Sequence, residues 1–159
     1  MARFRVRNDA KMWFKDLLEK SFKLDFDVFY FCFMAGIAAG PERKQSASVD
    51  DTAELVDSFP DKYKPRGKLL VALFLTQELE ALGVAMTEKK SVHTVVARLV
   101  SPDSPNYLSD EGMREFNKYA HGGYEVLRDW FEDRPRTLDS FLRTFKRNLD
   151  ASLKTVVKS

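Results

Sequence analysis

Cysteine and histidine are scarce, with one Cys and two His among 159 residues. A lone cysteine excludes an intramolecular disulfide, and Cys32 lies in an apolar run, which indicates a reducing compartment and a buried, inert thiol. The three residues are widely separated and give no zinc-binding spacing, and no acidic cluster has the pattern of a calcium loop. The sequence therefore predicts neither a metal nor another cofactor.

Long hydrophobic runs and catalytic motifs are also missing. The longest apolar run, residues 28–39, is too short to cross a bilayer, and the first residues lack the apolar core of a secretory signal. There is no Gly-x-Ser-x-Gly nucleophile elbow and no glycine-rich dinucleotide loop. His121 and Glu125, one helical turn apart, form the only plausible acid–base pair, and such pairs are more often surface contacts. We expect a cytoplasmic protein, not an enzyme, without a membrane partner.

What the chain does contain suits one globular domain over residues 1–159. Hydrophobic residues make up 44% and charged residues 31%, and thirteen Phe can build a core without disulfides. The formal charge of +2 conceals an uneven distribution. Residues 1–24 carry seven Lys or Arg and three Asp or Glu, and residues 134–159 carry seven and two. Basic ends around an acidic middle could bind double-stranded DNA, or the middle of the same or a neighbouring molecule, so a homo-oligomer stays open.

Residues 1–40 have the length pattern of a strand–helix–helix unit. Basic and apolar residues alternate from Arg3 to Arg7, which predicts a short basic strand or arm, and helices should follow over 8–21 and 28–39, the second ended by Gly40. A ribbon–helix–helix DNA-binding unit has this pattern, and Arg3, Arg5 and Arg7 would then face DNA. We favour the alternative, a basic edge strand or loose arm.

A polar exposed loop is expected at 41–48, followed by a short helix over 49–59. Four basic residues then occupy alternate positions before an apolar helix at 69–82. Basic side chains beside a helix N-terminus would suit a phosphate, although the spacing is not that of a Walker A loop and a solvated basic loop is the simpler interpretation. These four residues are Lys62, Lys64, Arg66 and Lys68.

Residues 77–100 resemble a helix-turn-helix, but the connection is long, and a helical hairpin turned by Gly83 is the stronger interpretation.

The next helix should lie within 109–135 and carry one apolar stripe. Its solvated face should hold Arg114, Lys118, His121, Glu125 and Arg128. Gly122 and Gly123 together cost a helix about 2 kcal/mol, which predicts a closely packed neighbour or a kink, or else the approach of a phosphate or other ligand.

A basic C-terminal helix is expected at 136–159. Taken together, the patterns predict a mainly α, compact single-domain bundle of about six helices with a short basic N-terminal strand or arm.

Two segments carry a resemblance, Ala35-Gly-Ile-Ala-Ala-Gly-Pro-Glu-Arg-Lys44 and Phe116-Asn-Lys-Tyr-Ala-His-Gly-Gly-Tyr-Glu-Val-Leu127. Over most of residues 3–133 the chain resembles a small bacterial family of DNA phosphorothioation-associated (Dnd-associated) proteins, which share a late Tyr-Ala-x-Gly-Gly-x-Glu-x-Leu motif. The residues that match the motif are Tyr119, Ala120, Gly122, Gly123, Glu125 and Leu127. The resemblance implies a setting in phage defence, and it carries over no catalytic residue.

The function expected from the sequence is that of a non-catalytic accessory or adaptor protein in a DNA phosphorothioation-linked modification or restriction system. Such a protein would bind protein components of that system and, through its basic residues, the DNA backbone. The alternative is a DNA-binding transcription regulator of the ribbon–helix–helix or helix-turn-helix type. A dimeric ribbon would distinguish the two, because regulators of the first type need one.

Overall fold

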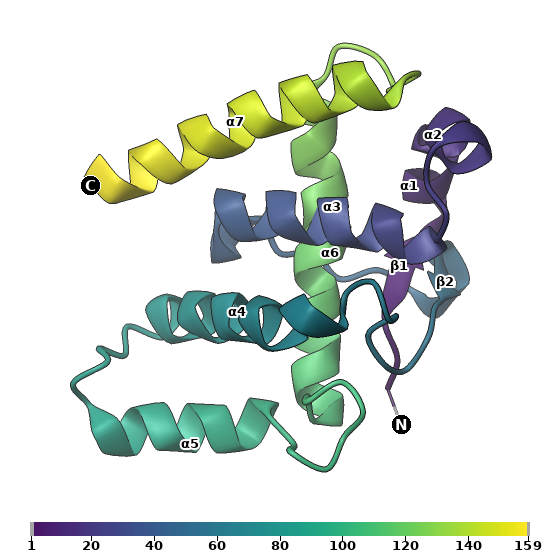
Figure 1. The fold of residues 1–159 in the computed structure, drawn as a ribbon. Coiled ribbons are helices and arrows are strands. Elements are labelled where there is room, and N and C mark those ends of the chain that lie inside the picture. The colour runs from purple at the N-terminus through teal and green to yellow at the C-terminus, as the bar shows by residue number, and fades with distance from the viewer. Residues whose placement is uncertain (1, 159) are drawn as a thin grey trace. The chain divides into compact units, whose positions relative to one another are not determined.

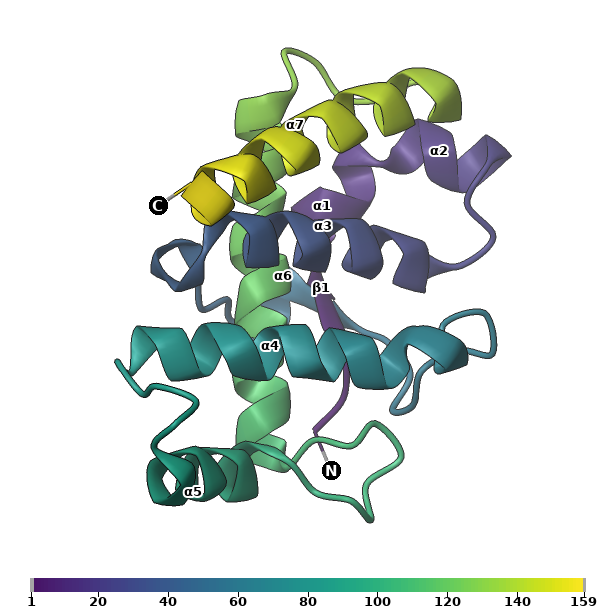
Figure 2. The same cartoon turned by 60° about the vertical axis from the view of Figure 1, so that its left-hand side comes forward.

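The protein is mainly α-helical, as predicted, with one small sheet (Figures 1 and 2). The computed structural model describes residues 2–158, and for 154–158 only the backbone. Seven α-helices lie in this part of the chain: α1 (Asn8–Trp13), α2 (Lys15–Lys20), α3 (Asp25–Ala39), α4 (Gly67–Ala81), α5 (Lys89–Leu99), α6 (Asp110–Trp130) and α7 (Leu138–Lys158). Strands β1 (Arg5–Arg7) and β2 (Thr52–Glu54) pair with each other.

The chain folds as two compact units, each made of two segments. Unit 1 comprises the residues up to Phe4 together with Glu54–Asn117, and unit 2 comprises Arg5–Ala53 together with the chain from Lys118 onward. The boundary between the units therefore falls inside β2 and inside α6. The single domain expected over residues 1–159 stays a prediction, and unfolding experiments can test it.

Unit 1 is built around an aromatic core and a helical hairpin. Phe4 packs against Phe59 and Phe116 with ring centroids 5.0 and 5.9 Å apart, and Phe74 of α4 lies 5.3 Å from Phe116. Helices α4 and α5 lie side by side in both views. The seven residues between them exceed the three- to four-residue turn of a helix-turn-helix, and Gly83 adopts φ +69°. The predicted hairpin turned by Gly83 is confirmed.

Unit 2 is organised around α3, whose residues are mostly apolar and of which ten of fifteen are buried. Gly40, with φ +101°, ends α3 before Pro41, as predicted. Phe141 of α7 sits 4.9 Å from Phe31, 5.2 Å from Phe14 and 5.4 Å from Phe131, so one ring joins segments far apart in the sequence.

Two predicted helices differ from the structure. The helix expected at 8–21 breaks at Phe14, which leaves helical geometry with ψ 8°, and becomes α1 and α2. The helix expected at 49–59 is wrong. Residues 49–51 form one 3-10 turn, and Thr52 is extended because β2 pairs with β1, a contact between distant segments that local periodicity cannot reveal.

The predicted exposed loop at 41–48 is exposed only in part. It opens with a 3-10 turn over Pro41–Arg43, where Arg43 pairs with Asp129 at 2.9 Å, and the Gln45 amide donates to the Lys118 carbonyl at 3.1 Å. The basic helix predicted at 136–159 begins at Leu138, and its last residue, Ser159, lies outside the described residues.

Candidate functional site

The Gly-Gly segment brings α6 into backbone contact with α3. A Cβ on Gly123 would overlap the Cys32 carbonyl and lie 2.9 Å from the Gly36 amide nitrogen, and a Cβ on Gly36 would overlap the Tyr119 carbonyl. Gly122 lies in the same way against the Arg43 carbonyl. Helix α6 continues unbroken through both glycines. The hypothesis of a closely packed neighbour is confirmed, since protein backbone fills the space that these glycines leave.

Most of the remaining motif residues also belong to the core. Tyr119, Ala120 and Leu127 are buried. The Tyr-Ala-x-Gly-Gly-x-Glu-x-Leu segment is therefore, in this structure, mainly a packing pattern between α3 and α6. Glu125 is the exception, because its carboxylate reaches a polar site at the surface.

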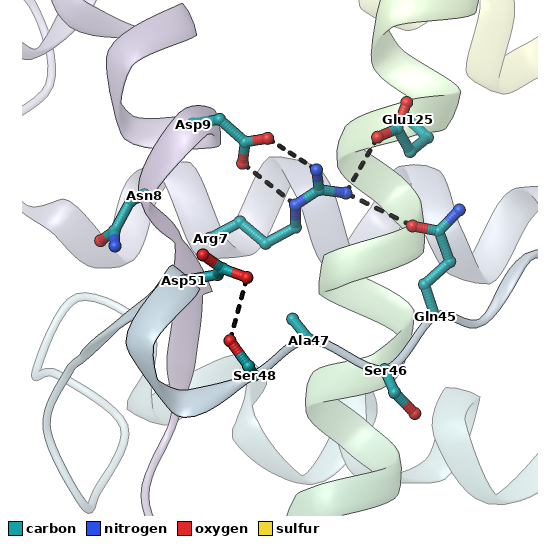
Figure 3. Close-up of a pocket in the computed structure, with 9 residues that line it drawn as sticks. All are labelled: Arg7, Asn8, Asp9, Gln45, Ser46, Ala47, Ser48, Asp51 and Glu125. Atoms are coloured by element: carbon teal, nitrogen blue, oxygen red, sulfur yellow. Dashed lines mark hydrogen bonds and ion pairs between the residues drawn. The ribbon is translucent and has the colours of Figure 1, made fainter.

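Arg7, the last residue of β1, is the centre of this polar site (Figure 3). Its Nη1 donates to Glu125 Oε1 at 2.9 Å and to Gln45 Oε1 at 3.3 Å. Its Nε and Nη2 donate to the two carboxylate oxygens of Asp9 at 3.0 and 2.6 Å. One guanidinium thus joins β1, α1, α6 and the segment after α3, and it is largely buried by them.

The Arg7 site borders a pocket of about 550 Å³. Residues 45–48 form one wall and Asn8 and Asp51 contribute to the lining, with Ser48 Oγ donating to Asp51 at 2.9 Å. The pocket is polar and holds three carboxylates beside one guanidinium. It contains no histidine or cysteine, so its lining offers hydrogen bonds and charge rather than an activated nucleophile.

His121 does not lie on the solvated face that the sequence predicted. Its side chain is buried, and Nδ1 has no hydrogen-bond partner among the described residues. Burial is the main cause that lowers its pKa to about 4, and the positive charges of Arg7 and Arg5 lower it further against the opposing effect of Asp9. Near neutral pH the imidazole is therefore uncharged, and Glu125 is engaged by Arg7 instead.

Two arginines of the predicted DNA-facing arm, Arg5 and Arg7, form hydrogen bonds within unit 2. Phe4 and Val6 are buried, and the arginines that alternate with them, Arg3, Arg5 and Arg7, are more exposed, so the predicted alternation of faces is confirmed. Arg5 Nε donates to Thr52 Oγ1 at 2.9 Å, and Arg7 is engaged as described above. The side chain of Arg3, in unit 1, makes a loose ion pair with Glu54, at 3.8 Å.

The basic loop, residues Lys62–Lys68 of unit 1, holds cations that are more exposed than Arg5 and Arg7. Its four cationic side chains are all exposed, while Tyr63 and Gly67 between them are buried. Gly67 begins α4 two residues earlier than predicted and packs against the Phe59 ring. Lys64 pairs with Asp61 at 2.9 Å, a hydrogen bond that raises the pKa of the lysine, and Lys68 lies 5.8 Å from the Tyr107 ring centroid.

The Arg7 pocket was not foreseen from the sequence. Arg7 and Asp9 are two residues apart, but the sequence pattern predicted only a basic strand or arm followed by a helix. Glu125 was recognised as a motif residue without its partner, because nothing local indicates that positions 7, 45 and 125 meet.

These features define a mainly α protein with a polar pocket in unit 2 and an exposed basic loop in unit 1. Within the described residues no three His, Cys, Asp or Glu are grouped to hold a metal ion, and no helix is long and apolar enough to cross a membrane. The chain matches no protein-family model, and no similar protein was found among curated sequences or solved structures.

Proposed function

We propose that this protein is a non-catalytic accessory or adaptor component of a DNA modification or restriction system linked to phosphorothioation. It contacts the DNA backbone through the basic loop and binds a protein component of the same system. The observation that supports this proposal most is the exposure of all four cations of the loop, whereas Arg5 and Arg7 are only partly exposed and are hydrogen-bonded to distant segments.

The geometry of the loop favours phosphate over base recognition. Lys64, Pro65 and Arg66 form a 3-10 turn that leads directly into α4, so the cations surround the start of a helix of fifteen residues. The Gly67 amide donates to the Lys64 carbonyl within this turn, so phosphate contact is expected from the exposed cationic side chains. Contacts of this kind fix a protein on a duplex without reading its sequence.

The partner protein is expected to engage unit 1 as well. Leu69 in the first turn of α4 is 59% exposed, and Leu82 and Met86, between α4 and α5, are 53% and 70% exposed. These apolar side chains belong to the same unit as the loop. A protein bound there would cover apolar surface on the unit that contacts DNA.

The resemblance to Dnd-associated proteins supplies the biological setting of the proposal. The alternative, a transcription regulator, would need a recognition element free to enter the major groove. The arm engages two of its three arginines within unit 2, and the hairpin connection is longer than that of a helix-turn-helix.

DNA binding across a salt series tests the proposal. The logarithm of affinity should fall linearly with the logarithm of salt concentration, with a slope of about −0.9 per phosphate contacted, and unrelated duplexes should bind alike. Changing Lys62, Lys64, Arg66 and Lys68 to Gln should abolish most of the binding and flatten the slope. A matched control changes four other exposed cations, Lys15, Lys20, Lys23 and Arg147, to Gln.

Equal losses of DNA affinity in both variants, or a strong preference for one duplex with a shallow slope, would contradict the proposed role of the loop.

Affinity capture from the host with and without nuclease, followed by mass spectrometry, tests whether a partner protein binds directly. Recovery of the same modification or restriction component in both samples supports direct protein binding, and its loss on nuclease treatment argues against it.

A further inference from the structure

A second pocket of unit 2, of about 610 Å³, is not used by the function proposed above. It lies where the end of α1, the C-terminal part of α6 and the connection from α6 to α7 come together. Its size is within the range typical of small-ligand sites, about 300–1,000 Å³. Aromatic rings and arginines share the lining: Trp13, Tyr124, Phe131, Arg128, Arg134 and Arg136.

The rings differ in what they can offer a ligand. Tyr124 is buried, and the guanidinium carbons of Arg7 and Arg128 lie 5.0 and 5.8 Å from its ring centroid. Trp13 and Phe131 are only half-buried, and they meet nearly perpendicularly, at 83°, with centroids 5.4 Å apart. A flat ligand could therefore stack on one of these rings and meet the other edge to face.

The charges around the pocket favour an anion of low charge. Arg128 and Arg136 are exposed, and the ion pair of Arg128 with Glu125 is loose, at 3.7 Å. Asp9 is neutralised by Arg7 and Arg134 pairs with Asp16 at 3.5 Å, so Arg128 and Arg136 remain opposite Glu132 and Asp133. Two arginines beside two carboxylates suit one phosphate rather than a chain of phosphates.

We propose that this pocket binds a nucleobase together with its phosphate. The base stacks on Trp13 and meets Phe131 edge to face, and Arg128 and Arg136 hold the phosphate, since a guanidinium matches phosphate geometry with two parallel hydrogen bonds. Stacking on aromatic side chains is tolerant of base identity because every base has a π-face. The site goes beyond the proposed function, because it lies in unit 2 and does not use the basic loop.

Fluorescence anisotropy with a labelled thymidine tetranucleotide tests the role of the base. Replacing the bases by abasic sites should weaken binding about tenfold, the loss expected when stacking is removed from a site of this kind. Adenosine monophosphate should compete with the tetranucleotide and inorganic phosphate should not. Competition by the mononucleotide identifies a site open to free nucleotides, and base-dependent binding without that competition identifies one that needs a strand.

Variants of the full-length chain test the residues. Arg136→Gln should weaken tetranucleotide binding about fivefold by removing a phosphate contact, and Arg143→Gln, an exposed position on α7, should leave it unchanged. Trp13→Leu should abolish the preference for base over abasic sites. If that variant is unstable, the wild-type comparison and Arg136→Gln decide the matter without it.

The fourfold Gln variant of the basic loop should bind the tetranucleotide as the wild type does, so failure of the loop and failure of this pocket are distinguishable. Equal binding of tetranucleotide and abasic strand, or equal effects of Arg136→Gln and Arg143→Gln, would overturn the proposal.

Discussion

At the scale of single residues, glycine decides how α3 and α6 meet. Gly36 and Gly123 allow the two backbones to touch, and neither position leaves room for a methyl group. The cost of glycine in a helix is thereby offset by packing, since the close approach brings Tyr119, Leu127 and their neighbours into the core. The sequence predicted that a neighbour was needed. It could not identify Cys32 and Gly36 as that neighbour, because the contact joins segments about ninety residues apart.

Whether replacing Gly123 stabilises or destabilises the protein tests this explanation. In an exposed helix, Gly→Ala stabilises by about 1 kcal/mol. We expect Gly123→Ala to destabilise by about 1–3 kcal/mol instead, because the new methyl group meets the Cys32 carbonyl. Gly83→Asn is the control, since Gly83 has open space around it and asparagine tolerates its positive φ. A stabilised Gly123→Ala in urea unfolding would refute close packing.

His121 predicts a pH dependence of stability. The folded-state pKa is about 4 against an ordinary 6.5. Above pH 6.5 the imidazole is neutral in both states. Below it the unfolded chain takes up a proton that the folded protein does not, so stability should fall between pH 6.5 and 4 by about 2–3 kcal/mol.

Urea unfolding of wild type and His121→Gln at pH 7.5, 5.5 and 4.5 measures this effect. The wild type should lose more stability on acidification than the variant, and carboxylates common to both cancel in the difference. Parallel losses in the two proteins would show that His121 titrates normally.

At the scale of elements, the arm illustrates what a sequence pattern can and cannot give. Alternation from Arg3 to Arg7 correctly predicted a strand with one buried face, because that rule depends only on the period of two. The role of the exposed face depended on distant partners, Thr52 for Arg5 and Glu125 for Arg7, which local periodicity cannot reveal. For the same reason β2 was predicted as a helix.

We expect Arg7→Gln to destabilise the protein by about 1–3 kcal/mol, since several short charged hydrogen bonds are lost from a largely buried site. Arg3→Gln, on the same arm, should change stability by less than about 1 kcal/mol, because its ion pair is long and half-exposed. Thermal or urea unfolding of the two variants measures the difference. Similar losses of stability in the two variants would mean that the arm contributes to stability only through its net charge.

At the scale of the whole molecule, the mainly α class followed from composition and periodicity, whereas the division into two units did not. Each unit combines an N-terminal segment with a segment from much later in the chain. Packing between such distant segments produces no pattern in the local sequence. Because the boundary cuts β2 and α6, we expect both units to unfold in one transition, with equal calorimetric and van't Hoff enthalpies.

Gly112→Ala in unit 1, where a Cβ would overlap the Leu99 carbonyl, and Gly123→Ala in unit 2 should each shift the whole transition. Two transitions, each sensitive to one substitution, would instead establish independent domains.

Cys32 gives the molecule a built-in chemical reporter. Its thiol is fully buried, its backbone carbonyl lies against Gly123 of α6, and burial raises its pKa above the ordinary thiol value. A thiol reagent should therefore not modify the native protein directly, and labelling has to wait until the helices separate. The rate of labelling by a colorimetric disulfide reagent then records how often unit 2 opens, in unmodified protein, without a fluorophore or an engineered site.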